Sequence, residues 1–229
     1  MTTSRPEHLL HSFKKSVIFY AIMLVAVLLC VYWLDRVLAD FIYRQSFANA
    51  FIKLLSNTPL VLEVLAGGVL ALCIAPKLRR QYSWLAIHLT MTLILASILR
   101  VGAKYLFGRT WPETWVNNNP SWITDRIEGF HPFAEGLAYN SFPSGHALFT
   151  FALATIFWYH LPRYRPCWIA AMCAVIAGQL GQNYHYLGDL LAGATLGTLV
   201  AQMVIVTTGK LRVPGLAPHH QDGRNGYHD

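Results

Sequence analysis

The sequence predicts an all-α integral membrane protein: a bundle of six transmembrane helices with a long extracytoplasmic loop between the third and fourth helices. The prediction rests on its composition, on six apolar runs and on the distribution of its basic residues. Of the 229 residues, 55% are hydrophobic and 13% are charged, whereas charged residues make up about 25% of an average soluble protein. This composition indicates a membrane protein.

Six apolar runs account for the six helices, because a hydrocarbon core about 30 Å thick needs roughly 20 helical residues. Five runs carry no Asp, Glu, Lys or Arg, and they cover residues 16–34, 81–99, 136–162, 166–188 and 190–209. The sixth run, 59–75, is shorter and contains Glu63. Glu63 could belong to a site, pack between helices or lie at the bilayer surface, and we favour the bilayer surface.

The first run follows Lys14 and Lys15, as the apolar part of a signal peptide would. Such a part usually has about 7–15 residues. Because this run is longer, we expect it to be retained as a helix. Residues 1–209 are then a single membrane domain, and residues 210–229 form a polar, flexible tail.

The basic residues fix the predicted orientation, because Lys and Arg concentrate in cytoplasmic loops. They cluster in four segments that six crossings would place on one side: Arg5 with Lys14 and Lys15; Lys77 with Arg79 and Arg80; Arg163 with Arg165; Lys210 with Arg212 and Arg224. Both termini are therefore expected in the cytoplasm. The net charge of +7 mainly reflects this topology. Nucleic-acid binding is not expected, because no soluble segment has a basic stripe with interleaved aromatic residues.

The predicted loop 104–143 is too long to be a simple connection, because loops above about 15 residues are usually functional or disordered. It contains seven aromatic residues after Phe107, which argue against disorder. Some of these aromatics could also form a belt at the bilayer surface. In the last run, Gly193 and Gly197 form a GxxxG pair, which predicts close packing of two helices.

Three polar clusters fall at the ends of predicted spans: KYLFGRTWP (104–112), PSGH (143–146) and YHYLGD (184–189). The topology places all three on the external side. In the third cluster, His185 and Asp189 are four residues apart and would share a helix face. A carboxylate there can fix the tautomer of the imidazole and leave its other nitrogen free to attack. The alternative is a pair that only satisfies its own polar groups.

The second cluster has the features of an anion site. Ser144 is a natural helix cap, and Gly145 lets a ligand approach the free N–H groups of the first turn. His146 could then give a proton to a leaving oxygen. Lys104 and Arg109 of the first cluster supply positive charge for such an anion, unless they only reach towards the bilayer surface. Together, the three clusters predict phosphoryl transfer through a phosphohistidine.

The three clusters resemble, in order and spacing, the signature motifs of the type 2 phosphatidic acid phosphatase (PAP2) superfamily, whose members are mostly six-helix membrane phosphatases. The resemblance places the catalytic core at about residues 100–197. It implies that His185 attacks phosphorus, that Asp189 orients it and that His146 protonates the leaving group. It also implies that the phosphate oxygens are held without a metal or other cofactor by Lys104, Ser144 and Gly145.

Two positions depart from the family pattern. Trp111 and Gln179 stand where the first and third motifs have arginines. Arg109, two residues before Trp111, could replace the first arginine. Gln179 could give the phosphate only a neutral hydrogen bond, roughly half as strong as a charge-assisted one. Other basic groups of the loop, Arg126 and His131, are further candidates.

These expectations describe a lipid phosphatase at the outer face of a bacterial inner membrane, with a periplasmic active site. Undecaprenyl diphosphate, phosphatidylglycerophosphate, phosphatidic acid and lipid A all present phosphate at that depth. Two alternatives stay open: a phosphotransferase using the same intermediate, and a non-catalytic lipid-binding protein on a degenerate phosphatase fold. Two histidines and a carboxylate could also bind iron or zinc, but Lys104 and Arg109 would disfavour a cation.

Overall fold

The structure is a computed structural model that describes residues 5–115 and 118–210, with side chains described from Ser16 to Gly209. The predicted tail 210–229 therefore lies outside the described residues, except for the backbone of Lys210. The α-helices are α1 (Arg5–Leu29), α2 (Asp35–Gln45), α3 (Ala50–Ser56), α4 (Thr58–Leu72), α5 (Pro76–Phe107), α6 (Trp122–Asp125), α7 (Gly145–His160), α8 (Arg165–Gly181) and α9 (Leu187–Lys210). A π-helical turn (Cys30–Leu34) joins α1 to α2, and 3₁₀ turns cover Leu137–Tyr139 and Pro162–Tyr164.

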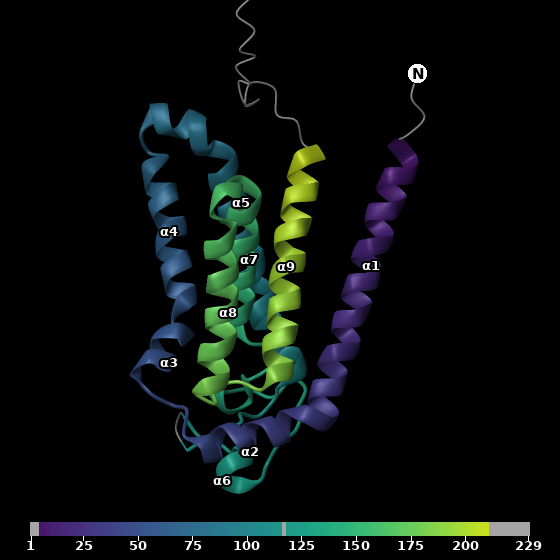
Figure 1. Cartoon of the computed structure of the whole chain (residues 1–229), viewed down its shortest axis with the longest axis vertical. Helices are drawn as coiled ribbons and strands as arrows, with labels where there is room; N and C mark the ends of the chain where they lie inside the picture. The colour runs from purple at the N-terminus through teal and green to yellow at the C-terminus, as the bar shows by residue number, and fades with distance from the viewer. Residues whose placement is uncertain (1–4, 116–117, 211–229) are drawn as a thin grey trace, which may run out of the picture.

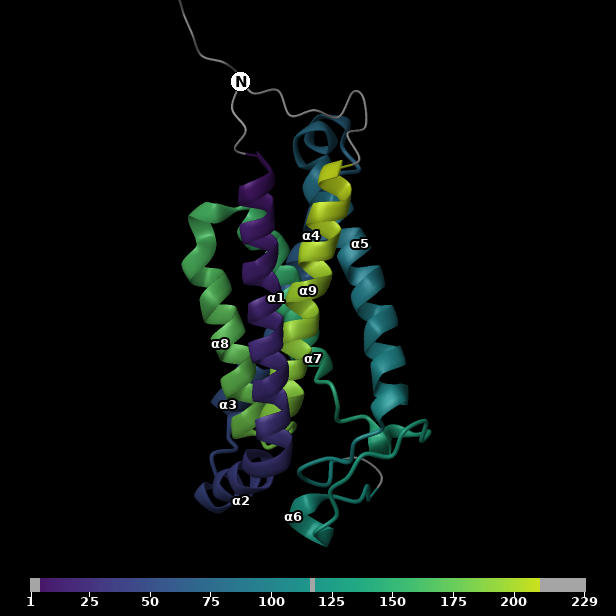
Figure 2. The ribbon, with the colours of Figure 1, turned by 90° about the vertical axis from the view of Figure 1, so that its right-hand side faces the viewer.

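The long helices run side by side along one axis, and α7 lies inside the bundle, where it packs against α4, α5, α8 and α9 (Figure 1). Helices α2, α3 and α6 gather with the loop segments 108–115 and 118–144 at one end. The N-terminal end of α1 and the turn between α4 and α5 lie at the opposite end, and Figure 2 shows the same division. The predicted all-α class is confirmed: the described residues contain isolated β-bridges but no longer strand.

Three helical segments are long and apolar enough to cross a membrane: Ser16–Gln45, Pro76–Phe107 and Leu187–Gly209. A fourth is possible if α3 and α4, bent by 43° relative to each other, form one span. Helices α7 and α8 have 16 and 17 residues, which at 1.5 Å per residue gives about 25 Å. The prediction of six spans is thus supported for three to four of them.

The predicted run 136–162 is longer than the helix it contains. Its first nine residues belong to the loop, and α7 begins only at Gly145, where Ser144 caps it: the Ser144 hydroxyl accepts a hydrogen bond from the Ala147 N–H. The loop residues Ser141 and Phe142 are buried nevertheless. Residues 136–144 carry no Asp, Glu, Lys or Arg, which explains why composition alone extended the run.

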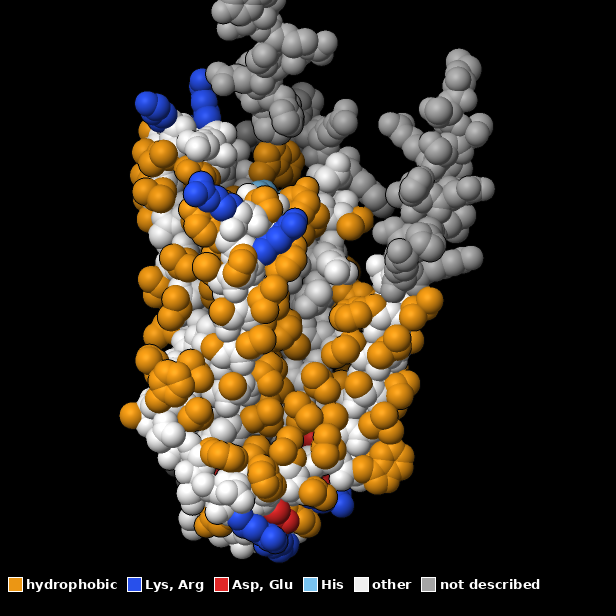
Figure 3. Space-filling model, viewed as in Figure 1, with side chains coloured by type: hydrophobic (Ala, Val, Ile, Leu, Met, Phe, Trp, Pro, Cys, Tyr) orange, Lys and Arg blue, Asp and Glu red, His pale blue; other side chains and the backbone are white. Residues whose placement is uncertain are grey.

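The sides of the bundle are apolar. Large hydrophobic side chains of α1, α4 and α5, such as Ile22, Val64 and Ile98, are more than half exposed. Hydrophobic side chains cover the length of the bundle in Figure 3, while Lys and Arg gather towards its two ends. Such a band is too large for a soluble surface and is what lipid contact requires.

The glycine pair of α9 packs against α7, as predicted. A Cβ on Gly193 would lie 2.3 Å from the Ser144 carbonyl oxygen, and one on Gly197 would lie 2.2 Å from that of Leu148. Both distances are too short for any side chain. The close approach brings the start of α9 against the start of α7, and the Ser144 N–H donates to the Asp189 carbonyl oxygen at 3.0 Å.

At the opposite end, a buried polar contact ties three helices together. His88 of α5 hydrogen-bonds through Nδ1 to Nε2 of His160 on α7, at 2.7 Å, and through Nε2 to Oγ1 of Thr208 on α9, at 2.6 Å. Buried polar groups need such partners. The contact fixes the helices that carry the site at the other end.

Candidate active site

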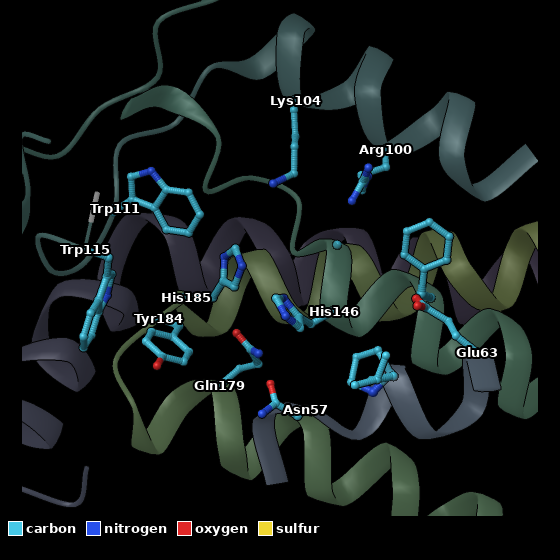
Figure 4. A pocket seen from close by; sticks show the side chains of 14 residues that line it. Asn57, Glu63, Arg100, Lys104, Trp111, Trp115, His146, Gln179, Tyr184 and His185 are labelled. Atoms are coloured by element: carbon cyan, nitrogen blue, oxygen red, sulfur yellow. The ribbon is translucent and has the colours of Figure 1, made fainter. Parts of the chain in front are cut away.

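A cavity of about 420 Å³ lies at the loop end of the bundle (Figure 4). Side chains of α4, α5, α7, α8 and the loop meet there, together with the segment that precedes α9. The lining residues are Asn57, Pro59, Leu60, Glu63, Arg100, Lys104, Trp111, Trp115, Gly145, His146, Phe149, Gln179, Tyr184 and His185. The three polar clusters of the sequence therefore converge on one space.

The two predicted catalytic histidines face this cavity from different elements. His146 lies in the first turn of α7, and His185 lies in the segment between α8 and α9. Their ring centroids are 6.3 Å apart, and the planes are inclined by 60°. Both rings therefore border one space, where each could contact the same bound phosphate.

Asp189 is the best-anchored group of the site. Its Oδ1 accepts a hydrogen bond from Arg109 at 2.6 Å, and its Oδ2 accepts from the Ser141 hydroxyl at 2.6 Å. The Tyr186 N–H donates to the same Oδ2 at 3.2 Å. The carboxylate is fully buried, so these donors replace the water it has lost.

His185 lies beside this carboxylate, with Nδ1 at 3.5 Å from Oδ2 of Asp189 and 3.4 Å from the Ser141 hydroxyl. The sequence predicted that the pair shares a helix face, but His185 precedes α9, which begins at Leu187. The two side chains meet because the chain turns into the helix there. Since Nδ1 faces the acid, Nε2 is the nitrogen left for the cavity.

Burial lowers the pKa of His185 below its ordinary value of 6.5, although the hydrogen bond and the charge of Asp189 act in the opposite direction. The imidazole is therefore neutral at neutral pH. A neutral imidazole with one oriented nitrogen is the form that can act as a nucleophile.

Arg109 does not line the cavity. Its side chain is fully buried among three carboxylates: Asp189 at 2.6 Å, Asp35 at 2.8 Å and Glu128 at 2.9 Å. Burial lowers the pKa of the guanidinium, but the three acids outweigh it and raise that pKa. The sequence assigned Arg109 to the phosphate; the structure places it behind Asp189, where it holds the carboxylate that faces His185.

The predicted phosphate-binding residues occupy different places. Lys104 lines the cavity, donates to the Asn140 carbonyl oxygen at 2.5 Å and lies 5.7 Å from the centre of the Trp111 ring. Gly145 lines it at the start of α7. Ser144 is fully buried, and its hydroxyl caps the helix.

Sequence reasoning missed several lining residues, above all Arg100, which lies one helical turn before Lys104 on α5. The spacing of four residues between Arg100 and Lys104 could have predicted that both side chains lie on one face of the helix. Glu63, which we expected at the bilayer surface, also lines the cavity, although its side chain is exposed. The other loop candidates lie elsewhere: Arg126 pairs with Asp40 at 2.7 Å, and the His131 ring packs on Tyr139.

Within residues 5–115 and 118–210, no three His, Cys, Asp or Glu side chains are grouped as metal ligands. The cavity presents two imidazoles, an ammonium, a guanidinium and one carboxylate, that of Glu63. This set suits an anionic ligand better than a cation.

Comparison with known families settles the fold family. The model of the PAP2 superfamily matches residues 84–212, more than half of the chain. The chain belongs to the PAP2 superfamily. The matched region contains all three polar clusters, and it also includes Arg100.

Three relatives are named lipid A 1-phosphatases. Those of Rhizobium johnstonii and Rhizobium etli are each 30% identical over 134 residues, which is 56% of this chain and 51% and 54% of theirs. That of Porphyromonas gingivalis is 32% identical over 78 residues, 30% of this chain and 16% of its own. The chain thus spans about half the length of the Rhizobium relatives. No solved structure matches it significantly.

Trp111 and Gln179, the predicted counterparts of the two motif arginines of the PAP2 pattern, both line the cavity. The Trp111 ring packs on His185, with centroids 5.1 Å apart, and its Nε1 donates to the Leu137 carbonyl oxygen at 2.7 Å. Gln179 is fully buried; its Nε2 donates to the Ser56 carbonyl oxygen at 3.1 Å, and its Oε1 has no partner among the described residues. Neither side chain brings the charge that an arginine would.

Proposed function

We propose that this protein is a membrane lipid phosphatase that removes phosphate from a lipid phosphate or diphosphate through a phosphohistidine. The observation that carries the proposal is the convergence of His146, His185 and Lys104 on one cavity. Membership of the PAP2 superfamily and the lipid A 1-phosphatase relatives point to the same chemistry.

The geometry suggests the roles. Nε2 of His185 attacks phosphorus, while Asp189 holds the opposite ring nitrogen and stabilises the charge that develops. The bond from phosphorus to the lipid oxygen breaks, and its electron pair stays on that oxygen. His146 gives this oxygen a proton, so the lipid alcohol leaves. The phosphate is now bonded to His185.

The second half of the reaction regenerates the enzyme. His146, now neutral, takes a proton from a water molecule, whose oxygen attacks the phosphohistidine. The bond between phosphorus and Nε2 breaks, and inorganic phosphate leaves. In both halves Lys104 and the N–H groups at the start of α7, from Gly145 on, would stabilise the phosphate oxygens, and Ser144 would support them as the cap of that helix. Gln179 would add one neutral amide contact.

Topology supports a periplasmic site in the inner membrane. The site lies at one end of the bundle, and the α4–α5 turn lies at the opposite end (Figure 1). Lys77, Arg79 and Arg80 lie at that opposite end, at the start of α5. Basic residues mark the cytoplasmic side, so the cavity would open on the other face. Because the relatives are named lipid A 1-phosphatases, a lipid A phosphate is the first substrate to test.

The test is phosphate release by purified protein from lipid A, undecaprenyl diphosphate, phosphatidylglycerophosphate and phosphatidic acid. We expect release from at least one lipid by the wild type, and nearly none by His185→Ala or His146→Ala with unchanged thermal unfolding. Transfer of the phosphate to a second lipid would indicate a phosphotransferase. Equal release by wild type and both variants would refute the catalytic proposal.

A further inference from the structure

The exposed arginine of the cavity wall, Arg100, lies inside a membrane-spanning helix, where a charge is expensive and usually functional. On α5 the buried residues Leu89, Thr92 and Ala96 form a stripe towards the bundle interior. Arg100 and Lys104 continue this stripe at four-residue intervals. The cavity lies beside Arg100 and Lys104, the cationic end of this stripe. Figure 4 shows the side chains of both residues pointing into the cavity from α5.

Contacts place Arg100 beside the start of α7. An ideal Cβ on Gly145 would lie 2.9 Å from Cδ and 3.9 Å from Nη1 of Arg100. The guanidinium carbon also lies 5.4 Å from the centre of the Phe149 ring, one turn further along α7. The guanidinium is therefore held against the helix end whose free N–H groups would receive a phosphate.

Arg100 is also free to bind an anion. No carboxylate among the described residues lies within ion-pair distance of it, and it makes no hydrogen bond to another described residue. Arg109, in contrast, is held by three acids. Of Arg100 and Arg109, only Arg100 has guanidinium N–H groups that are free to donate hydrogen bonds to a ligand.

We propose that Arg100 binds the transferred phosphate, together with Lys104 and the first turn of α7, in place of the motif arginines that Trp111 and Gln179 replace. The inference rests on the proposed phosphatase function. It gives the site two cations that come from successive turns of one helix. The ligand class is a phosphate monoester or diphosphate at its terminal phosphorus.

The test measures the affinity of orthovanadate, a phosphate analogue, for purified wild type, Arg100→Gln, Arg100→Lys and the control Arg79→Gln. We expect Arg100→Gln to weaken binding roughly 10- to 100-fold, as loss of hydrogen bonds to a charged group does. Arg100→Lys keeps the charge without the fork and should lose less. Arg79 is an exposed arginine at the far end of the same helix, so Arg79→Gln should change nothing.

Steady-state kinetics with the hydrolysed lipid complete the experiment. Arg100→Gln should raise KM as well as weaken orthovanadate binding, with an unchanged thermal unfolding midpoint. A rise in KM with unchanged orthovanadate affinity would place Arg100 on another part of the lipid and overturn the proposal. If the wild type hydrolyses no lipid, the proposed function fails, while the orthovanadate comparison still decides the role of Arg100.

Discussion

Two regions around the site use arginine in opposite ways. Behind Asp189, Arg109 has no exposed surface and contacts three carboxylates from distant parts of the chain: Asp35, Glu128 and Asp189. On the cavity wall, Arg100 is exposed and has no acidic partner among the described residues. The first region has more negative than positive groups and lies behind the proposed nucleophile, His185. The second contributes the cations Arg100 and Lys104 to the cavity wall. The comparison teaches that acidic partners and burial, rather than closeness to a motif, assign the role of an arginine.

The largest effect is expected for Arg109→Met. It would leave Asp35 and Asp189 buried without their cation, while Glu128 would keep its pair with Arg36 at 2.7 Å. Breaking a buried ion pair costs about 3–5 kcal/mol. We expect a marked fall in the thermal unfolding midpoint, or failure to accumulate as folded protein. Arg109→Lys keeps the charge and should fold better. A wild-type unfolding midpoint for Arg109→Met would contradict the structural role of Arg109. Arg100→Gln is the contrasting variant, because its unfolding midpoint should not change.

The pH dependence of kcat/KM tests the same buried region, because this quantity reports the groups of the free enzyme. Loss of the proton that His146 donates should set the alkaline limb of the profile. The pKa of His185 is lowered from 6.5, and its neutral form attacks, so kcat/KM should fall about tenfold per pH unit once the pH drops below that lowered pKa. The acid limb should therefore have its midpoint below 6.5. A midpoint at or above 6.5 would mean that Asp189 outweighs burial.

Ser141→Ala should give a smaller loss. It removes the hydroxyl that donates to Oδ2 of Asp189 at 2.6 Å, and a hydrogen bond to a charged group contributes about 1.5–3 kcal/mol. We expect kcat to fall about tenfold, with little change in KM. Ser121→Ala is the matched control, because Ser121 is also buried in the loop but hydrogen-bonds to Thr114 and the Thr124 N–H. Equal losses of kcat in both variants would show a general effect of the loop.

The sequence could predict the parts of this site that depend on short motifs. Lys104, His146 and His185 were found because each lies in a polar cluster at the end of an apolar run. The sequence could not separate Arg109 from Arg100, because that requires knowing that Asp35 and Glu128 reach Arg109 from 74 and 19 positions away in the chain. The prediction of the α7 span began too early, because residues 136–144 before the helix carry no charge that would mark them as loop.

The smallest effect is expected for Arg126→Gln, which completes the comparison with a third arginine. Arg126 pairs with Asp40 at 2.7 Å, and its side chain is 58% exposed. Such surface pairs contribute about 0–1 kcal/mol, so stability should hardly change. Arg126 does not line the cavity, so orthovanadate affinity and lipid KM should match the wild type, as in the partner variant Asp40→Asn. A loss of orthovanadate affinity in Arg126→Gln alone would mean that the loop closes over the phosphate, and would weaken the assignment of that role to Arg100.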